Sequence, residues 1–151
     1  MKRAAITLAT LAFALAIGLP VQAQTDFSGT WKLNAEKSDM GGGGRTGRGG
    51  GMTGDMVVKQ SATELSVTRG EQTIVYKLDG SEITIAGGRG NSQAKARVEG
   101  ATIVIETTRA MGEMTMTSKA TWSIDGGSLV ITSVTATPNG DRTTKAVYDK
   151  Q

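Results

Sequence analysis

FSGTWKLN, residues 27–34, is the stretch that decides the fold. Trp31 and Leu33 share one side of it, and polar residues at positions 30, 32 and 34 alternate with them. This alternation is typical of a β-strand with one dry face and one solvated face. Gly29 lies two residues before the tryptophan and lets the backbone pass closely under a large ring. We therefore predict that this stretch is the first strand of a β-meander and that Trp31 closes one end of its core.

The chain from Asp55 onward repeats the strand pattern and shows no sustained helical period. Its content of Val, Ile and Thr also favours strands. Asp79-Gly80 is the strongest hairpin signal among the turns. The predicted strands cover residues 56–60, 64–69, 72–78, a segment marked by Ile83 and Ile85, 93–99, 101–109, 113–124, 128–137 and 142–148.

Ten consecutive strands joined by short turns must protect their edges from other chains. Closing the sheet into an up-and-down antiparallel barrel of about ten strands does this. An open sandwich is the alternative. The barrel is favoured because long meanders curl as they twist. The predicted fold class is therefore all-β, with a single domain at residues 24–151.

Residues 1–23 have the pattern of a cleaved export signal. Lys2 and Arg3 precede an apolar run over residues 4–19, and small residues near Ala23 offer a cleavage position. The run is shorter than the roughly 20 residues that a membrane span needs. An uncleaved anchor is the alternative. We expect a bacterial protein exported to the periplasm or secreted, without a membrane span in the mature chain.

The composition argues against several classes of function. The formal charge of +3 falls to +1 without Lys2 and Arg3, which gives little attraction for nucleic acid. The chain has no Cys and no His, so it lacks disulfides, the commonest general base and the common catalytic triads. No convergent carboxylate pair is visible. We expect no enzyme activity, no cofactor and no bound metal.

Residues 41–54 form a glycine-rich segment after the first strand, and nine of these fourteen residues are Gly. Such a segment buries too little surface to offset its ordering entropy, so we predict a disordered loop. Arg45 and Arg48 give it a likeness to the Arg-Gly segments of RNA-binding tails. It lacks the interleaved aromatic residues that base stacking needs, which favours a solvated linker.

The pattern Phe27-x-Gly29-x-Trp31-x-Leu33 resembles the opening strand of the calycins, which include the lipocalins and the intracellular fatty-acid-binding proteins. The opening stretch also resembles that of small exported bacterial lipocalin-like proteins of unknown role. The resemblance implies a barrel with a ligand site in its interior. Fatty-acid-binding proteins carry a helical lid where this chain has its glycine-rich segment. They also carry Arg-x-Tyr on the last strand, where residues 146–148 here read Ala-Val-Tyr.

Strand parity identifies candidate ligand-binding residues in the barrel lumen. Large apolar side chains would line an adaptable pocket, and an arginine at the mouth would bind an anionic head group through its fork of donors. The alternatives are ordinary core packing and arginines solvated at strand ends. Arg69 also shares the inward parity of Leu65 and Val67. The candidates are Trp31, Tyr76, Arg109, Met114, Met116, Trp122, Arg142 and Tyr148.

Two functions fit these observations. The first is an exported barrel that binds a small, mostly apolar or amphiphilic ligand in its lumen. The alternative is a non-enzymatic envelope or interaction module with a filled barrel, which contacts a partner through residues 41–54 or a strand edge. The packing of the barrel interior distinguishes them.

Overall fold

The computed structural model of this chain describes residues 24–41, 54–87 and 90–151. The predicted export signal and residues 42–53 of the glycine-rich segment lie outside the described residues. Within them, no helix is long and apolar enough to cross a bilayer.

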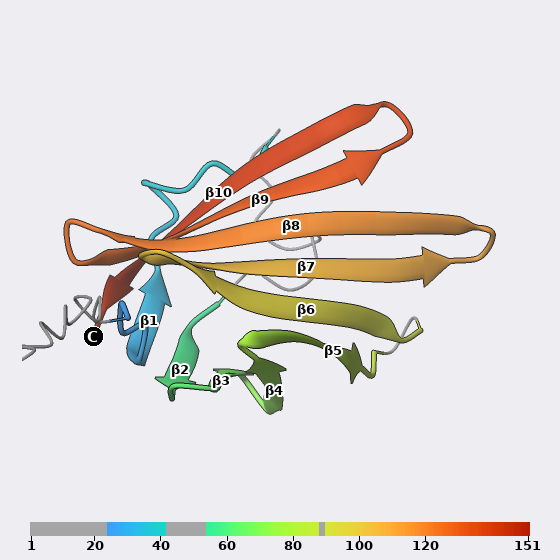
Figure 1. The fold of residues 1–151 in the computed structure, drawn as a ribbon. Helices are drawn as coiled ribbons and strands as arrows, with labels where there is room; N and C mark the ends of the chain where they lie inside the picture. The colour runs from blue at the N-terminus through green and yellow to red at the C-terminus, as the bar shows by residue number, and fades with distance from the viewer. Residues whose placement is uncertain (1–23, 42–53, 88–89) are drawn as a thin grey trace, which may run out of the picture.

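Ten antiparallel strands make up the described part of the chain, which contains no α-helix (Figure 1). The predicted all-β meander is therefore confirmed. The long hairpins formed by β7–β8 and β9–β10 extend away from the end where the strands converge. The strands are β1 Gly29–Leu33, β2 Met56–Gln60, β3 Glu64–Arg69, β4 Gln72–Lys77, β5 Asp79–Ile85, β6 Ser92–Glu99, β7 Thr102–Met111, β8 Met114–Asp125, β9 Ser128–Thr137 and β10 Gly140–Lys150.

The strands form one sheet in the order β4-β3-β2-β1-β10-β9-β8-β7-β6-β5. Each strand pairs with its neighbour in sequence except across the β4–β5 connection, and β1 pairs with β10. Trp31 lies opposite Lys150, and Leu33 lies opposite Tyr148. This contact joins the first strand to the last and turns the meander into a nearly closed barrel, as predicted.

The predicted hairpin at Asp79-Gly80 is wrong, because β4 and β5 are the two edges of the sheet. The Asp79 carboxylate accepts a hydrogen bond from the Ser81 backbone N–H at 2.8 Å, which completes a local turn without strand pairing. The Leu78 N–H donates to the Thr63 carbonyl at 2.8 Å, on the side of β3. The chain therefore bends away at this point, and the barrel stays open along the β4–β5 seam.

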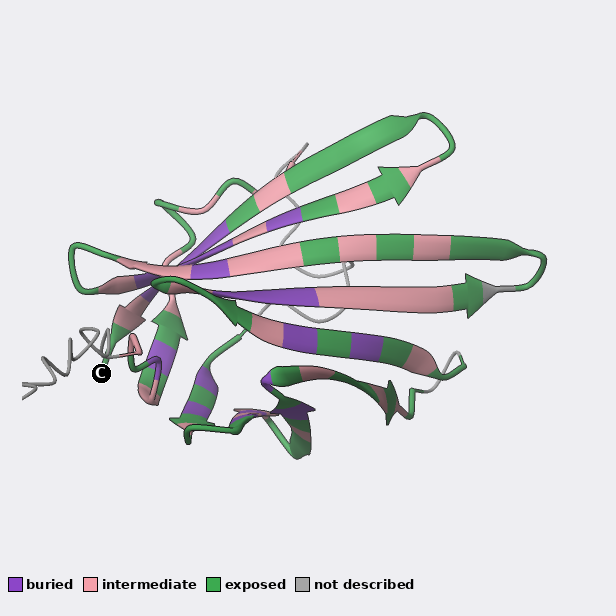
Figure 2. Ribbon diagram, in the orientation of Figure 1, coloured by how far each residue is buried: buried purple, intermediate pink, exposed green. Residues whose placement is uncertain are grey.

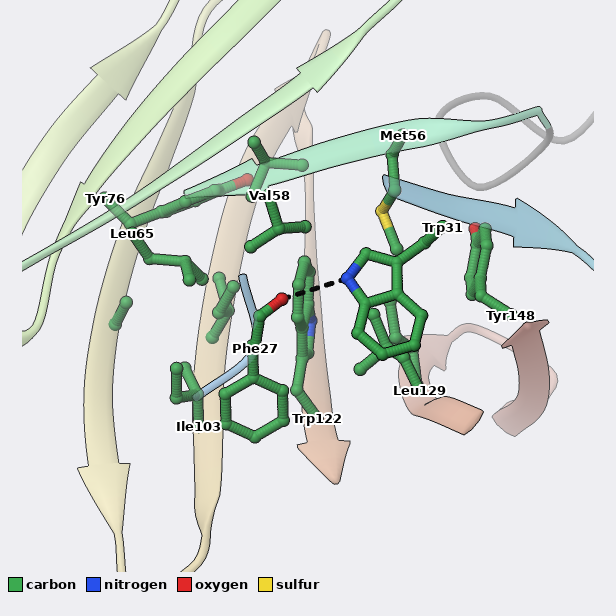
Figure 3. Packing of buried hydrophobic residues seen from close by; sticks show 14 of the residues in the cluster. Phe27, Trp31, Met56, Val58, Leu65, Tyr76, Ile103, Trp122, Leu129 and Tyr148 are labelled. Atoms are coloured by element: carbon green, nitrogen blue, oxygen red, sulfur yellow. Dashed lines mark hydrogen bonds between the residues drawn. The ribbon is translucent and has the colours of Figure 1, made fainter. Parts of the chain in front are cut away.

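The hydrophobic core lies at the converging end of the barrel, where buried positions gather on several strands (Figure 2). Phe27 and Trp122 pack edge to face there, with ring centroids 6.4 Å apart. The Trp31 indole N–H donates to the Phe27 carbonyl at 2.9 Å (Figure 3). Only 2% of the Trp31 surface is exposed, which confirms that this residue closes one end of the core.

Gly29 has the role that the sequence predicts. Its φ of +147° is a conformation that other residues rarely adopt. An added Cβ would lie 2.9 Å from Lys150 Cε and 3.7 Å from Trp31 Nε1. Lys150 Nζ in turn lies 5.5 Å from the centroid of the Trp31 ring, at a distance suited to a cation–π contact. The glycine thus leaves room for a lysine that covers the buried indole.

Asp149 on β10 should make the stability of the fold decrease as the solution becomes acidic. Hydrogen bonds from Asn34 at 2.6 Å and Ser128 at 2.9 Å lower the pKa of this carboxyl, and Lys37 at 3.6 Å adds to the effect. A lowered pKa stabilises the fold above the unfolded value of about 4, and this contribution is lost as the pH falls through the lower folded value. We expect Asp149→Asn to be less stable than wild type at neutral pH. The difference in urea midpoint between wild type and Asp149→Asn should disappear at a pH below the pKa of Asp149 in the folded protein.

The matched control for this experiment is Asp125→Asn, because Asp125 is an exposed carboxylate at the end of β8. It forms no ion pair or side-chain hydrogen bond with any described residue. We expect its urea midpoint to follow wild type across the same pH range. A difference between wild type and Asp149→Asn that stays constant with pH would show that the carboxylate charge is not the cause.

Candidate ligand-binding site

The inward-facing side chains of the sheet form rows that the strand register defines. Residues of one row lie side by side on adjacent strands. The first row is Ile103, Trp122, Ile131 and Ala146; the second is Ala96, Ile105, Ala120, Ser133 and Thr144; the third is Ala94, Thr107, Ser118, Thr135 and Arg142; and the fourth is Ser92, Arg109 and Met116.

The rows change in character from the converging end outward. The first row is apolar and buried, and Trp122 is its largest member. The second row is still mostly buried, since Ala96, Ile105 and Ser133 are at most 4% exposed. In the third row, Thr107, Ser118 and Thr135 are only half-buried. Figure 2 shows this as a change from buried to intermediate positions along β7 and β8. Inward-facing residues of a filled barrel would be buried throughout, so the interior is tightly packed at one end only.

Four of the predicted site residues lie in the packed core. Trp31, Tyr76, Trp122 and Tyr148 are all buried and belong to one hydrophobic cluster (Figure 3). Burial raises the pKa of both tyrosines, whereas the nearby charge of Arg69 opposes this shift. These residues form the floor of the interior, and contact with a ligand stays a prediction for each.

The other four predicted residues lie toward the far end of the strands. Met116 and Arg109 are half-buried in the fourth row, while Met114 is 52% exposed at the start of β8. Arg142 is exposed, and its guanidinium donates to the backbone carbonyls of Met40, at 3.1 Å, and Gly41. The structure thus separates the candidates into a floor and a distal group.

Arg69 on β3 is the functional candidate that the site prediction omitted. Its guanidinium lies 3.4 Å from the Met56 sulfur and donates a hydrogen bond to the Tyr148 hydroxyl. The inward parity of Arg69 was visible in the sequence. Its approach to Tyr148 was not, because that contact requires β1 to bridge β10 and β2. An arginine from β3 therefore meets the last-strand tyrosine, whereas position 146 itself holds Ala.

The inner face carries positive charge without a counter-charge. The Nε atoms of Arg69 and Arg109 are buried and have no hydrogen-bond partner among the described residues. Every Asp and Glu of the chain lies within the described residues, yet none of them occupies an inward-facing strand position. The strand acids face outward or lie at strand ends; they are Glu64, Asp79, Glu82, Glu99, Glu106, Asp125, Asp141 and Asp149.

Such an arrangement is suited to binding an anion. A charge that is partly removed from water is costly when no opposite charge pairs with it. A carboxylate fits the guanidinium fork and would satisfy the buried donor. By contrast, no group of three or more potential metal-ligating residues occurs in the described part of the chain.

Comparisons with known proteins identify the fold. No protein family matches the sequence, and no curated protein does either. A SAHS (abundant heat soluble) protein from Ramazzottius varieornatus superposes with a TM-score of 0.64 at 15% identity, covering 86% of this chain and 98% of that one. Zebrafish ileal bile acid-binding protein, complexed with cholic acid, gives 0.57 at 17% identity, covering 83% and 98%. The wild-type fluorescent protein UnaG gives 0.59 at 17% identity, covering 83% and 97%.

These similarities extend over nearly the whole length of each solved protein. They show that the chain has the calycin fold, in agreement with the resemblance of its opening strand. At such low sequence identity they establish the fold alone.

Proposed function

We propose that this protein is an exported, non-enzymatic carrier that binds a small, mostly apolar molecule with an acidic group in its barrel interior. The observation that carries the proposal is the half-buried inner face beyond the packed core, together with two inward-facing arginines, Arg69 and Arg109, that have no counter-charge. The apolar part of the ligand would lie along the second and third rows. Its acidic group would bind at Arg69.

The apolar contribution comes from side chains that are small enough to leave room for a ligand. Ala120 is half-buried beside Ser133, and Ile83 and Ile85 on β5 are partly buried against the core. Burying about 300 Å² of ligand surface at about 25 cal/mol per Å² contributes roughly 7 kcal/mol before the costs of association.

The polar contribution comes from Arg69 and the Tyr148 hydroxyl at the floor of the interior. A carboxylate placed there would accept charge-assisted hydrogen bonds, which are shorter and stronger than neutral ones. One structurally similar protein, the zebrafish ileal bile acid-binding protein, was crystallised with cholic acid, an amphipathic steroid with a carboxylate. This supports the proposed chemical class.

Export is the other part of the proposal, and the pattern of residues 1–23 supports it. The mass of the protein recovered from the bacterial periplasm or medium tests it. Cleavage after Ala23 would leave Gln24 as the first residue, whereas an uncleaved chain would contradict the assignment.

Two neighbouring threonines on β7 allow a sharp test of interior binding. Thr107 faces inward in the third row, and Thr108 faces outward between Gln93 and Thr117. We expect Thr107→Trp to weaken binding of the fluorescent probe cis-parinaric acid at least about tenfold, because the indole would occupy the ligand's space. Thr108→Trp is the matched control and should bind like wild type.

Both variants should be compared at equal folded fraction, judged by far-ultraviolet circular dichroism. Equal binding by the two variants would place the probe outside the barrel and contradict the proposal. If wild type binds neither cis-parinaric acid nor any competing apolar acid, the interior is not a ligand site, and an interaction module becomes the better explanation.

A further inference from the structure

We propose that the ligand is a diacid, with one acidic group at each end of an apolar body. Arg69 would bind the inner acid and Arg109 the outer one. This inference rests on the proposed binding function and adds the chemical class of the ligand.

Arg69 and Arg109 share two features: each has an unpaired buried nitrogen, and neither forms an ion pair with a described residue. Both have a buried Nε without a partner among the described residues. The ion pairs of that part of the chain use other cations, namely Lys37, Lys95 and Arg97. Arg97 is the instructive contrast, because it faces outward and meets Glu99 and Glu106. The protein thus neutralises an outer arginine with its own acids and leaves the two inner ones without any.

The two sites are too far apart for a single acidic group. Arg69 bonds to Tyr148, which lies two residues beyond the first row at the packed end. Arg109 lies in the fourth row, six residues along β7 from Ile103. At about 3.3 Å per strand residue, Arg109 is roughly 20 Å along the strand from the first row. A ligand that pairs with both arginines needs two acids joined by an extended body.

The rows between these arginines suit the body of such a molecule. The second row and the inner part of the third contain Ala, Ile, Ser and Thr but no charged side chain. Arg142 ends the third row and has the same inward parity, but its guanidinium already donates to the carbonyls of Met40 and Gly41. Arg142 is also exposed, whereas Arg109 is half-buried, and its buried Nε has no partner among the described residues. The Nη2 of Arg109 lies 3.6 Å from where a Gly87 side chain would begin.

The test compares hexadecanedioic acid with hexadecanoic acid, which have the same chain length and differ in the second carboxylate. Binding is measured by isothermal titration calorimetry at a pH where all carboxylates are ionised. We expect wild type to bind the diacid about tenfold more tightly. Arg109→Met should abolish this preference for the diacid, whereas Arg69→Met should weaken binding of both acids. Arg97→Met is the matched outer control and should change neither affinity.

Equal affinity of wild type for the two acids would overturn the diacid assignment while leaving interior binding intact. Loss of the preference in Arg142→Met instead of Arg109→Met would overturn the role of Arg109. If neither acid binds and cis-parinaric acid also fails to bind, the proposed function itself fails, so the two failures are distinguishable. Dodecanedioic acid should bind more weakly than hexadecanedioic acid, because its shorter body cannot reach both arginines.

Discussion

Replacing Trp31 with alanine is expected to lower the free energy of unfolding by about 3–5 kcal/mol. The side chain is 2% exposed, and its removal would leave a large cavity at the converging end of the barrel. The Phe27 carbonyl would also lose its indole donor, which lies at 2.9 Å. Urea denaturation followed by far-ultraviolet circular dichroism measures this loss without depending on tryptophan fluorescence.

Two further variants separate the contributions of the indole. Trp31→Phe keeps most of the apolar volume but not the N–H, so we expect a smaller loss of about 1–3 kcal/mol. Lys32→Ala changes the exposed neighbour on the same strand and should remain within about 0.5 kcal/mol of wild type. A Trp31→Ala protein as stable as wild type would show that the core does not depend on this residue.

Arg69→Met is expected to move stability and ligand affinity in opposite directions. Arg69 is half-buried, with a buried Nε and no acidic partner, which destabilises the ligand-free fold; an apolar side chain of similar length removes that cost. We expect the free energy of unfolding of the ligand-free protein to rise by about 1 kcal/mol. Affinity for an apolar acid should fall at least about tenfold, because the charged donor is gone.

Arg97→Met is the matched control for stability, since this arginine is paired with Glu99 and Glu106 on the outer face. It should give no gain, because exposed ion pairs contribute little and their loss stabilises nothing. A clear loss of stability in Arg69→Met would mean that the hydrogen bond to Tyr148 holds the barrel together. In that case the arginine would have a structural role, and the proposed anion site would lose its main support.

The strand positions were predictable because strand patterning is a local property of the chain. The eighth strand was predicted at residues 113–124 and lies at Met114–Asp125, and the ninth was predicted at its observed bounds of 128–137. In the eighth strand, apolar and polar side chains alternate over many residues, and the ninth strand is rich in Val, Ile and Thr between turn residues. The same parity indicated which arginines face inward. The hairpin at Asp79-Gly80 failed because its aspartate satisfies a local turn instead of directing strand pairing.

The sequence by itself determined the all-β class, the ten strands, the inward face and the closing role of Trp31, since these depend on residue type and spacing along short segments. Only the tertiary structure decided that β1 bridges β10 and β2, that β4 and β5 remain apart, and that Arg69 reaches Tyr148. Those contacts join residues far apart in the chain. They depend on the curvature of the whole sheet and on register across many strands, which no local pattern encodes.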